Sequence, residues 1–122
     1  MKAPQVTTIA LTLPATIWNV LPIEERPELT LLDWAIFELQ MAHSPVRTRH
    51  FAGYTVTDRE GRASSAILEF DPARMIGITE SSRVYHLRGR PGLTGDGAYV
   101  WGRWLKLSKA TGVVDITKSV LA

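Results

Sequence analysis

The chain of 122 residues contains no cysteine. This absence excludes a disulfide framework, a thiol nucleophile, and zinc or iron–sulfur sites built on cysteine ligands. Several classes of small enzyme and of small secreted domain are thereby removed.

Long apolar runs are missing as well. No window approaches the roughly 18 consecutive apolar residues that a membrane span requires. The N-terminal stretch carries Lys2 and several apolar residues, but threonines interrupt it and no small-residue cleavage site follows. We therefore expect a β-strand there and no signal peptide, a cytoplasmic location, and no membrane partner.

The chain has little net charge, since 14 basic and 12 acidic residues give +2. The distribution is uneven. Residues 1–46 hold 2 basic and 5 acidic side chains (−3), whereas residues 47–122 hold 12 and 7 (+5). A basic C-terminal part is compatible with an anionic partner, but in a small domain such a charge excess more often reflects a solvated surface.

What is present fits one globular unit. The composition is 45% hydrophobic and 21% charged, with no repeat or low-complexity tract, which is ordinary for a folded domain. A chain of this length buries about two thirds of its unfolded surface. We predict a single domain over residues 1–122.

The first half of the chain reads as strands. Val6–Leu13 and Thr16–Leu21 are rich in β-forming residues, and the proline-bounded loop Pro22–Glu28 follows. Thr30–Met41 fits a helical and a strand period alike. We prefer the strand, placed centrally in a sheet because both of its faces are apolar, with a helix covering one face.

The middle of the chain predicts two hairpins. The expected strands are Arg47–Asp58, Arg62–Phe70, Met75–Glu80 and Arg83–Arg88, with turns at Asp58–Gly61, Asp71–Arg74 and Ser81–Ser82. Gly61 is the expected positive-φ residue of the first turn, and Asp71–Arg74 has a type I signature. This spacing indicates one antiparallel sheet of about six strands, with a curl toward a barrel as an open alternative.

The pattern then changes to a helix over Asp96–Ser108, with Thr94 or Asp96 as its cap and Gly112 after its end. One side of the helix is apolar: Gly97, Val100, Trp101, Trp104, Leu105 and Ser108. Strand and helical turn both remain open for the tail after Val113. The predicted fold class is α+β, a mainly antiparallel sheet with one principal C-terminal helix packed on it.

The glycine-rich stretch Gly92–Gly97 resembles a phosphate-binding loop only in its spacing. It lacks the lysine and the serine or threonine that a P-loop needs, and its glycine order differs from the dinucleotide fingerprint. A weaker hypothesis keeps one anion at the helix N-terminus beside Arg88 and Arg90. The competing interpretation is that Asp96 already caps these amides.

No other motif specifies an enzyme. The three histidines, His43, His50 and His86, share no spacing that forms a metal face. Ser64 and Ser65 lack a nucleophile elbow and are expected to face solvent in a strand. We therefore predict no metal, no cofactor and no catalytic residues.

What remains is a set of basic and aromatic residues that form three candidate binding groups. They are Arg88 and Arg90, expected on one strand face with His86; Tyr99, Arg103 and Lys106 on the outer helix face; and Arg47 and Arg49 on one side of a strand. Guanidinium groups bind phosphates or carboxylates, and tyrosine offers a stacking surface.

These residues predict a non-enzymatic binding or regulatory module, of inhibitor or adaptor type, that docks on a larger protein with an acidic surface. One alternative is a nucleic-acid-binding protein that uses the same basic face. The other is a small enzyme that uses the glycine-rich loop and neighbouring acids. Self-association through an exposed edge strand also stays open.

Overall fold

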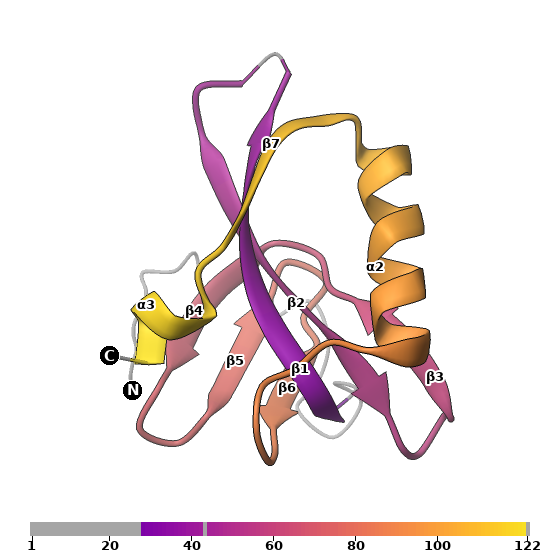
Figure 1. Cartoon of the computed structure of the whole chain (residues 1–122). Coiled ribbons are helices and arrows are strands. Elements are labelled where there is room, and N and C mark those ends of the chain that lie inside the picture. Colours follow the sequence, from indigo (N-terminus) through magenta and orange to yellow (C-terminus); the bar gives the residue numbers. More distant parts are fainter. Residues whose placement is uncertain (1–27, 43, 122) are drawn as a thin grey trace.

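The computed structural model describes residues 28–42 and 44–121 (Figure 1). Its elements are β1 (Glu28–Met41), β2 (Arg47–Thr55), β3 (Glu60–Ala63), β4 (Ile67–Asp71), β5 (Ile76–Thr79), β6 (Val84–Leu87), α2 (Gly95–Ser108), β7 (Ala110–Asp115) and α3 (Thr117–Leu121). The predicted strands Val6–Leu13 and Thr16–Leu21, most of the loop Pro22–Glu28, and His43 lie outside these residues.

The central strand is β1. It contains the whole stretch from Thr30 to Met41, so the preferred strand prediction is confirmed. Along one edge it pairs antiparallel with β2. Along its other edge it pairs first with β6, in parallel, and then with β7, antiparallel. A register shift between Leu32 and Ala35, with Asp33 at a φ of 51°, lies between these two pairings. Where the two ladders on this edge are interrupted, groups outside the sheet complete the hydrogen bonding of β1: the Ile36 amide donates to the Thr117 hydroxyl (2.9 Å), and the Trp34 carbonyl accepts from the Gly92 amide (2.8 Å).

The seven strands form one sheet in the order β3-β2-β1-β6-β5-β4, with β7 paired to β1. Of the described strand pairs, only β1–β6 is parallel, and the predicted α+β class with a mainly antiparallel sheet and a helix packed on it is confirmed. The sheet is open. It bends enough for Phe70 of β4 to contact Phe51 of β2, with ring centroids 5.6 Å apart.

Apolar side chains fill both faces of the sheet, which matches the two apolar faces expected of β1. On one face, α2 covers a cluster formed by Leu39, Ala52 and Trp101 with Phe37, Met41, Trp104 and Leu105 around it. The opposite face carries the larger cluster, formed by Leu31, Trp34, Ile36, Phe51, Tyr85, Leu87 and Ile116. Figure 1 shows α2 standing alongside the sheet, with α3 on the other side of β1 and β7.

The predicted helix and the second hairpin are confirmed. The helix begins one residue earlier than predicted, at Gly95, and ends at Ser108 as predicted. The β5–β6 hairpin forms across Ser81 and Ser82. The turn after β4 forms as well, because the Asp71 carboxylate accepts hydrogen bonds from the amides of Ala73 (2.9 Å) and Arg74 (3.3 Å).

Two glycine predictions are wrong, because other residues take the left-handed conformation. The first turn covers Val56–Arg59, and Arg59 has the positive φ (55°), while Gly61 lies inside β3. Lys109, with a φ of 60°, terminates α2, while Gly112 lies inside β7. In the tail from Val113, residues 113–115 belong to strand β7 and Thr117–Leu121 form helix α3, so both open alternatives occur in succession.

The predicted strand Arg62–Phe70 is in fact two strands, and the break explains a third error. Ser64 lies in the break and is fully buried, so the expectation that it faces solvent is wrong. Its hydroxyl accepts from the Phe51 amide (2.8 Å) and donates to the Ser65 carbonyl (2.7 Å). A side-chain hydroxyl thus replaces a backbone partner where the ladder ends.

Among residues 28–42 and 44–121, no helix combines the length and the apolar character that crossing a membrane requires.

Candidate functional site

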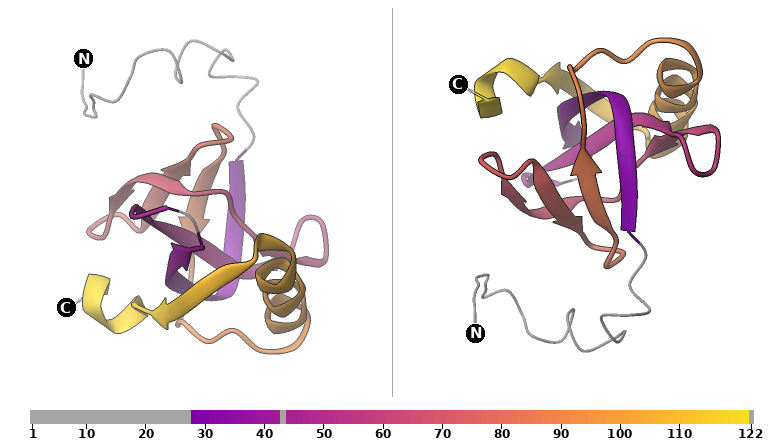
Figure 2. Two further views of the ribbon diagram at one scale, coloured as in Figure 1. Left: turned by 90° about the horizontal axis from the view of Figure 1, so that it is seen from above. Right: turned by 90° about the horizontal axis from the view of Figure 1, so that it is seen from below.

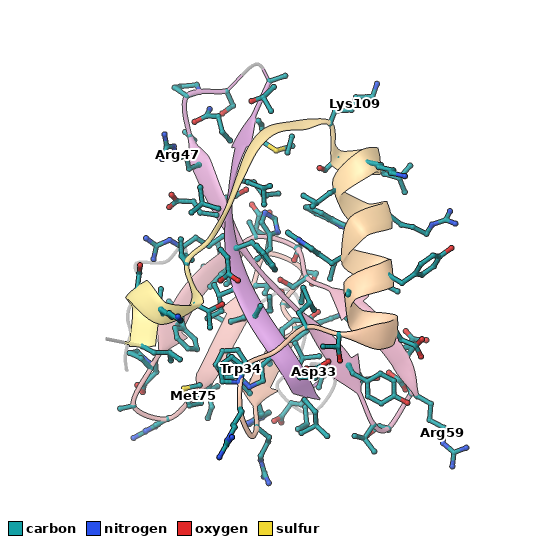
Figure 3. The ribbon with its side chains drawn as sticks, in the orientation of Figure 1. Asp33, Trp34, Arg47, Arg59, Met75 and Lys109 are labelled. Carbon is teal, nitrogen blue, oxygen red and sulfur yellow. The ribbon has the colours of Figure 1, made fainter. Side chains whose placement is uncertain are left out.

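The inner face of α2 is held on the sheet by a row of aromatic rings. Trp101 stacks on Phe37 of β1, with centroids 4.5 Å apart, and on Trp104, with centroids 5.2 Å apart. Trp104 in turn contacts the ring of His50 in β2 at 4.8 Å. Aromatic side chains bury large areas and prefer such offset contacts. These contacts anchor the inner face of α2 to the sheet, and side chains of its outer face point away from the sheet (Figure 3).

The N-terminal end of α2 is held by a carboxylate from β1. Asp33 accepts hydrogen bonds from the amide of Leu93 (2.9 Å) and from both the amide and the hydroxyl of Thr94 (2.7 Å each). The hydroxyl bond from Thr94 and then its amide bond hold the pKa of Asp33 below its ordinary value, because they stabilise the ionised form. Thr94 occupies the cap position, as predicted, but its hydroxyl makes no bond to the helix.

This arrangement changes the interpretation of the glycine-rich loop. The two loop amides before the helix, those of Leu93 and Thr94, already donate to Asp33. The negative charge beside them thus comes from a residue about 60 positions earlier in the chain, while Asp96 remains exposed in the first helical turn. The loop is a strand-to-helix connection fastened to the sheet.

The outer face of α2 carries an exposed ridge. Tyr99 is 65% exposed, and one turn later Arg103 donates from Nη1 to the Tyr99 hydroxyl at 3.3 Å. The Arg103 guanidinium carbon lies 6.0 Å from the centre of the Tyr99 ring. Lys106 is exposed beside them, and Leu107, one turn after Arg103, is 78% exposed. We call Tyr99, Arg103, Lys106 and Leu107 the α2 ridge.

Leu107 is the member of this ridge that the sequence reasoning missed. Its signal was available, because residues 99, 103 and 107 follow each other at four-residue spacing and therefore share one helix face. Leu107 therefore adds exposed apolar area to the polar face of the amphipathic helix.

Arg47 and Arg49 lie on a different side of the molecule. Both pair with Glu38 of β1, at 3.5 Å and 3.3 Å. Side chains alternate between the faces of a strand, so His50 faces α2 while its neighbour Arg49 faces away from it. In Figure 3, Arg47 projects to the left of β1 and β7, whereas α2 stands to their right. The sheet therefore separates this arginine pair from the α2 ridge.

Arg88 and Arg90 form a third group, and their expected strand face with His86 is wrong. Strand β6 ends at Leu87, so both arginines lie in the exposed connection to α2. This connection is fixed by its backbone, since the Trp34 indole donates to the carbonyls of Arg88 (3.1 Å) and Gly89 (3.2 Å). His86 instead contacts Glu28, at 2.6 Å. The seven predicted residues thus form three groups, on β2, on the connection from β6 to α2, and on α2.

His50 is the one buried histidine of the described chain, at 5% exposure. Its Nδ1 lies 2.9 Å from the Ser64 carbonyl, which only accepts, so Nδ1 carries the proton and Nε2 accepts from the Thr48 hydroxyl at 2.8 Å. Burial lowers the pKa of His50 because it disfavours the charged ring. Both ring nitrogens are therefore occupied in a neutral imidazole beneath α2.

Two shallow grooves are lined by residues outside α2. One, of about 770 Å³, runs over β4 and β5 and is lined by Phe70, Ile76 and Ile78 among others. The second, of about 630 Å³, lies between β1, β4 and α3, and its charged lining includes Glu38 and Arg49, which already pair with each other. Within the described ranges, no group of three histidine, aspartate or glutamate side chains could hold a metal ion.

No family model matches the sequence, and comparisons with curated proteins and with solved structures likewise found no match. A functional proposal for this chain therefore depends on the chemistry of its own surface.

Proposed function

We propose that this protein acts in the cytoplasm as a non-enzymatic binding or regulatory module, of inhibitor or adaptor type, that docks on the acidic surface of a larger protein through the α2 ridge. The observation that carries the proposal is the exposed pair of Tyr99 and Arg103, preassembled on a helix that the aromatic row fixes to the sheet.

The chemistry of the ridge supports a protein partner. Tyrosine and arginine are the residue types most enriched among the side chains that dominate interface energies. Because Arg103 already rests on Tyr99, less side-chain entropy is lost when a partner immobilises them. Leu107 adds exposed apolar area beside the charged groups. This combination of an aromatic ring, a guanidinium and an apolar side chain is typical of an interface centre.

The charge of the ridge supports an acidic partner. Arg103 and Lys106 lie on the outer face of α2, and Lys109 follows at its end. Asp96, in the first turn, is the one acidic residue in the helix. Opposite charges on the partner would steer the encounter and fix the orientation of the complex.

The separation of the three basic groups favours a protein partner over a nucleic acid. Binding to a phosphate backbone needs several cations along one continuous track. Arg47 and Arg49 are instead paired with Glu38 on the opposite side of the sheet from the ridge. The enzyme alternative loses support as well, since three amides of the glycine-rich loop already have partners in β1: those of Leu93 and Thr94 donate to Asp33, and that of Gly92 donates to the Trp34 carbonyl.

A capture experiment tests the proposal. The immobilised wild-type chain, Arg103→Glu and the control Lys118→Glu are exposed to lysate of the native host, and captured partners are then purified for titration. Lys118 is exposed on α3, so its reversal makes the same charge change away from the ridge. We expect saturable, moderately salt-dependent binding that Arg103→Glu weakens on the order of tenfold or more, with Lys118→Glu close to wild type.

Two outcomes would reject the proposal. If Arg103→Glu retains every partner with unchanged affinity, the α2 ridge is not the contact surface. If nuclease treatment abolishes capture, and a gel-shift series shows retention that falls steeply as salt rises, the protein binds nucleic acid instead.

A further inference from the structure

We propose that β7 is a self-association edge, through which two copies of this chain pair antiparallel, β7 against β7, about a two-fold axis. This surface is distinct from the α2 ridge, and the inference does not depend on the proposed function.

The first observation is that β7 is open along one edge. Of the described strands, only β1 pairs with it. Five of its six residues are exposed, including Val113 (46%) and Val114 (56%). Figure 2 shows β7 along one margin of the molecule, between α2 and α3 (left view). An uncovered strand edge presents unpaired amides and carbonyls, which are a template for another strand.

The second observation is that the other edge strands carry the usual protection and β7 does not. Strand β3 has only four residues, and Glu60 and Arg62 form an ion pair on it at 3.5 Å. Strand β4 carries Glu69 and ends at Asp71, directly before Pro72. Charged side chains and proline discourage strand addition. From Ala110 to Val114, by contrast, β7 contains no charged residue and no proline.

The third observation is the direction of the backbone groups. The amide of Ile116, directly after β7, donates to the Ile36 carbonyl of β1 at 2.9 Å. Alternate residues of a strand direct their amides to opposite edges. The Val114 amide therefore faces β1, while the amides of Val113 and Asp115 face away from it. These outward groups would form the new ladder.

The charges at the two ends of β7 select a second copy as the occupant. The strand begins directly after Lys109 and ends at Asp115. Antiparallel pairing about an axis near Gly112 places Lys109 of one copy beside Asp115 of the other, and the same contact recurs at the opposite end. A surface that is complementary to itself in this way fits an isologous dimer. Two strands of six residues form less than a standard interface, so a weak, concentration-dependent dimer is expected.

A proline substitution on the outward edge tests the inference. Val113→Pro removes one outward amide and leaves the β1–β7 hydrogen bonds intact, since proline is tolerated at edge positions whose amide faces solvent. Its control is Val113→Thr, which keeps both the amide and the branched shape. Sedimentation across a concentration series should show a dimer for the wild type and Val113→Thr. For Val113→Pro it should show dimerisation weakened roughly tenfold or more, with an unchanged circular dichroism spectrum.

A charge substitution gives a second, independent readout. Aspartate tolerates the left-handed conformation that residue 109 adopts. Lys109→Asp therefore keeps the backbone and places like charges at both ends of the paired strands. It should weaken the dimer roughly three- to tenfold. Arg59→Asp makes the same charge change at another exposed positive-φ residue, in the turn between β2 and β3, and should leave the dimer unchanged.

Hydrogen exchange separates the remaining outcomes. Protection of the Val113 and Asp115 amides that rises with protein concentration supports the dimer. Protection that is equal at all concentrations means that the chain itself covers this edge, and a wild type that stays monomeric at millimolar concentration with both amides unprotected means that the edge is bare. Either of the last two results overturns the inference.

Discussion

Replacing Gly61 with alanine tests how α2 is seated on the sheet. Gly61 lies in β3, directly beneath the first turn of the helix. A Cβ atom at this position would overlap the carbonyl oxygen of Asp96, and would lie 2.6 Å from the Asp96 carbonyl carbon and 2.9 Å from the Gly97 nitrogen. All three atoms belong to the backbone, so no side-chain rotation can relieve the overlap.

The expected loss of stability follows from this geometry. Ordinary contacts between such heavy atoms need about 3.5 Å, so the start of α2 would have to move by about 1 Å. That shift would loosen the stacking of Trp101 on Phe37. Overpacking of this kind destabilises by about 1–3 kcal/mol. Alanine also restricts the unfolded chain, which offsets this loss by up to about 1 kcal/mol. Because the obstacle is backbone, we expect a net loss of about 2 kcal/mol of stability for Gly61→Ala.

Gly102→Ala is the matched control, since Gly102 lies in the interior of the same helix and an added Cβ there meets no atom within 4 Å. Alanine should stabilise the helix by about 1 kcal/mol at this position. Urea titrations of both variants, followed by circular dichroism and tryptophan fluorescence, should give free energies of unfolding that change in opposite directions with similar m-values. If Gly61→Ala is neutral or stabilising, the close approach of α2 to β3 is refuted.

Three further predictions concern the same helix. The pKa of His50 is lowered from 6.5 in the folded chain, so the unfolded chain binds a proton first as the pH falls. The free energy of unfolding should therefore decrease as the pH falls below about 6.5. Urea titrations between pH 7.5 and 5 should show a weaker decrease in His50→Gln than in the wild type. An equal pH dependence in both proteins would contradict a neutral, buried His50. Asp33→Ala should lose about 1–2 kcal/mol through the lost bonds to Thr94. Asp33→Asn keeps one acceptor oxygen and a residue type that tolerates positive φ, so it should lose less stability. Equal losses for the two variants in chemical denaturation would argue against a stabilising role for the Asp33–Thr94 hydrogen bonds. Finally, in thermal unfolding Trp101→Ala should destabilise by about 3–5 kcal/mol and the exposed Tyr99→Ala by less than about 0.5 kcal/mol, and equal losses in the two variants would contradict the assignment of the inner and outer faces of α2.

Local patterns predicted most of the elements correctly. The helix from Asp96 to Ser108 was readable because Trp101 and Trp104 recur with helical spacing on one face, and the structure buries that face. The turn after Asp71 was readable because aspartate followed by proline fixes a turn within four residues. Such features depend on neighbours in the chain, and a sequence records those directly.

The turn errors arose where contacts between distant segments override a local preference. Gly61 looked like a turn residue, but it is needed where α2 presses on β3. Gly112 looked like the end of the helix, but Lys109 accepts the left-handed conformation so that β7 can begin at once. A glycine in a sequence signals an unusual requirement without saying whether that requirement is a backbone angle or a close approach.

The candidate site was only partly predictable, for the same reason. Tyr99, Arg103 and Lys106 share one helix face by spacing alone, so their grouping could be read from the sequence. The relation of Arg47 and Arg49 to that face could not, because it depends on which side of β2 faces the helix. That choice follows from the pairing of β2 with β1 and from the contact of His50 with Trp104. One residue of register shift would exchange the two sides.

By itself, the sequence determined the α+β class, the principal helix with its apolar and basic faces, and the hairpin from β5 to β6. Only the tertiary structure decided that β1 pairs with β6 and β7 along one edge, that Asp33 accepts from the amides of Leu93 and Thr94, and that Arg47 and Arg49 lie across the sheet from the α2 ridge. The physical reason is range. Periodicity and turn chemistry act over a few residues. Strand register and bulges bring together segments tens of residues apart, and they decide which partners Asp33 and the arginines meet.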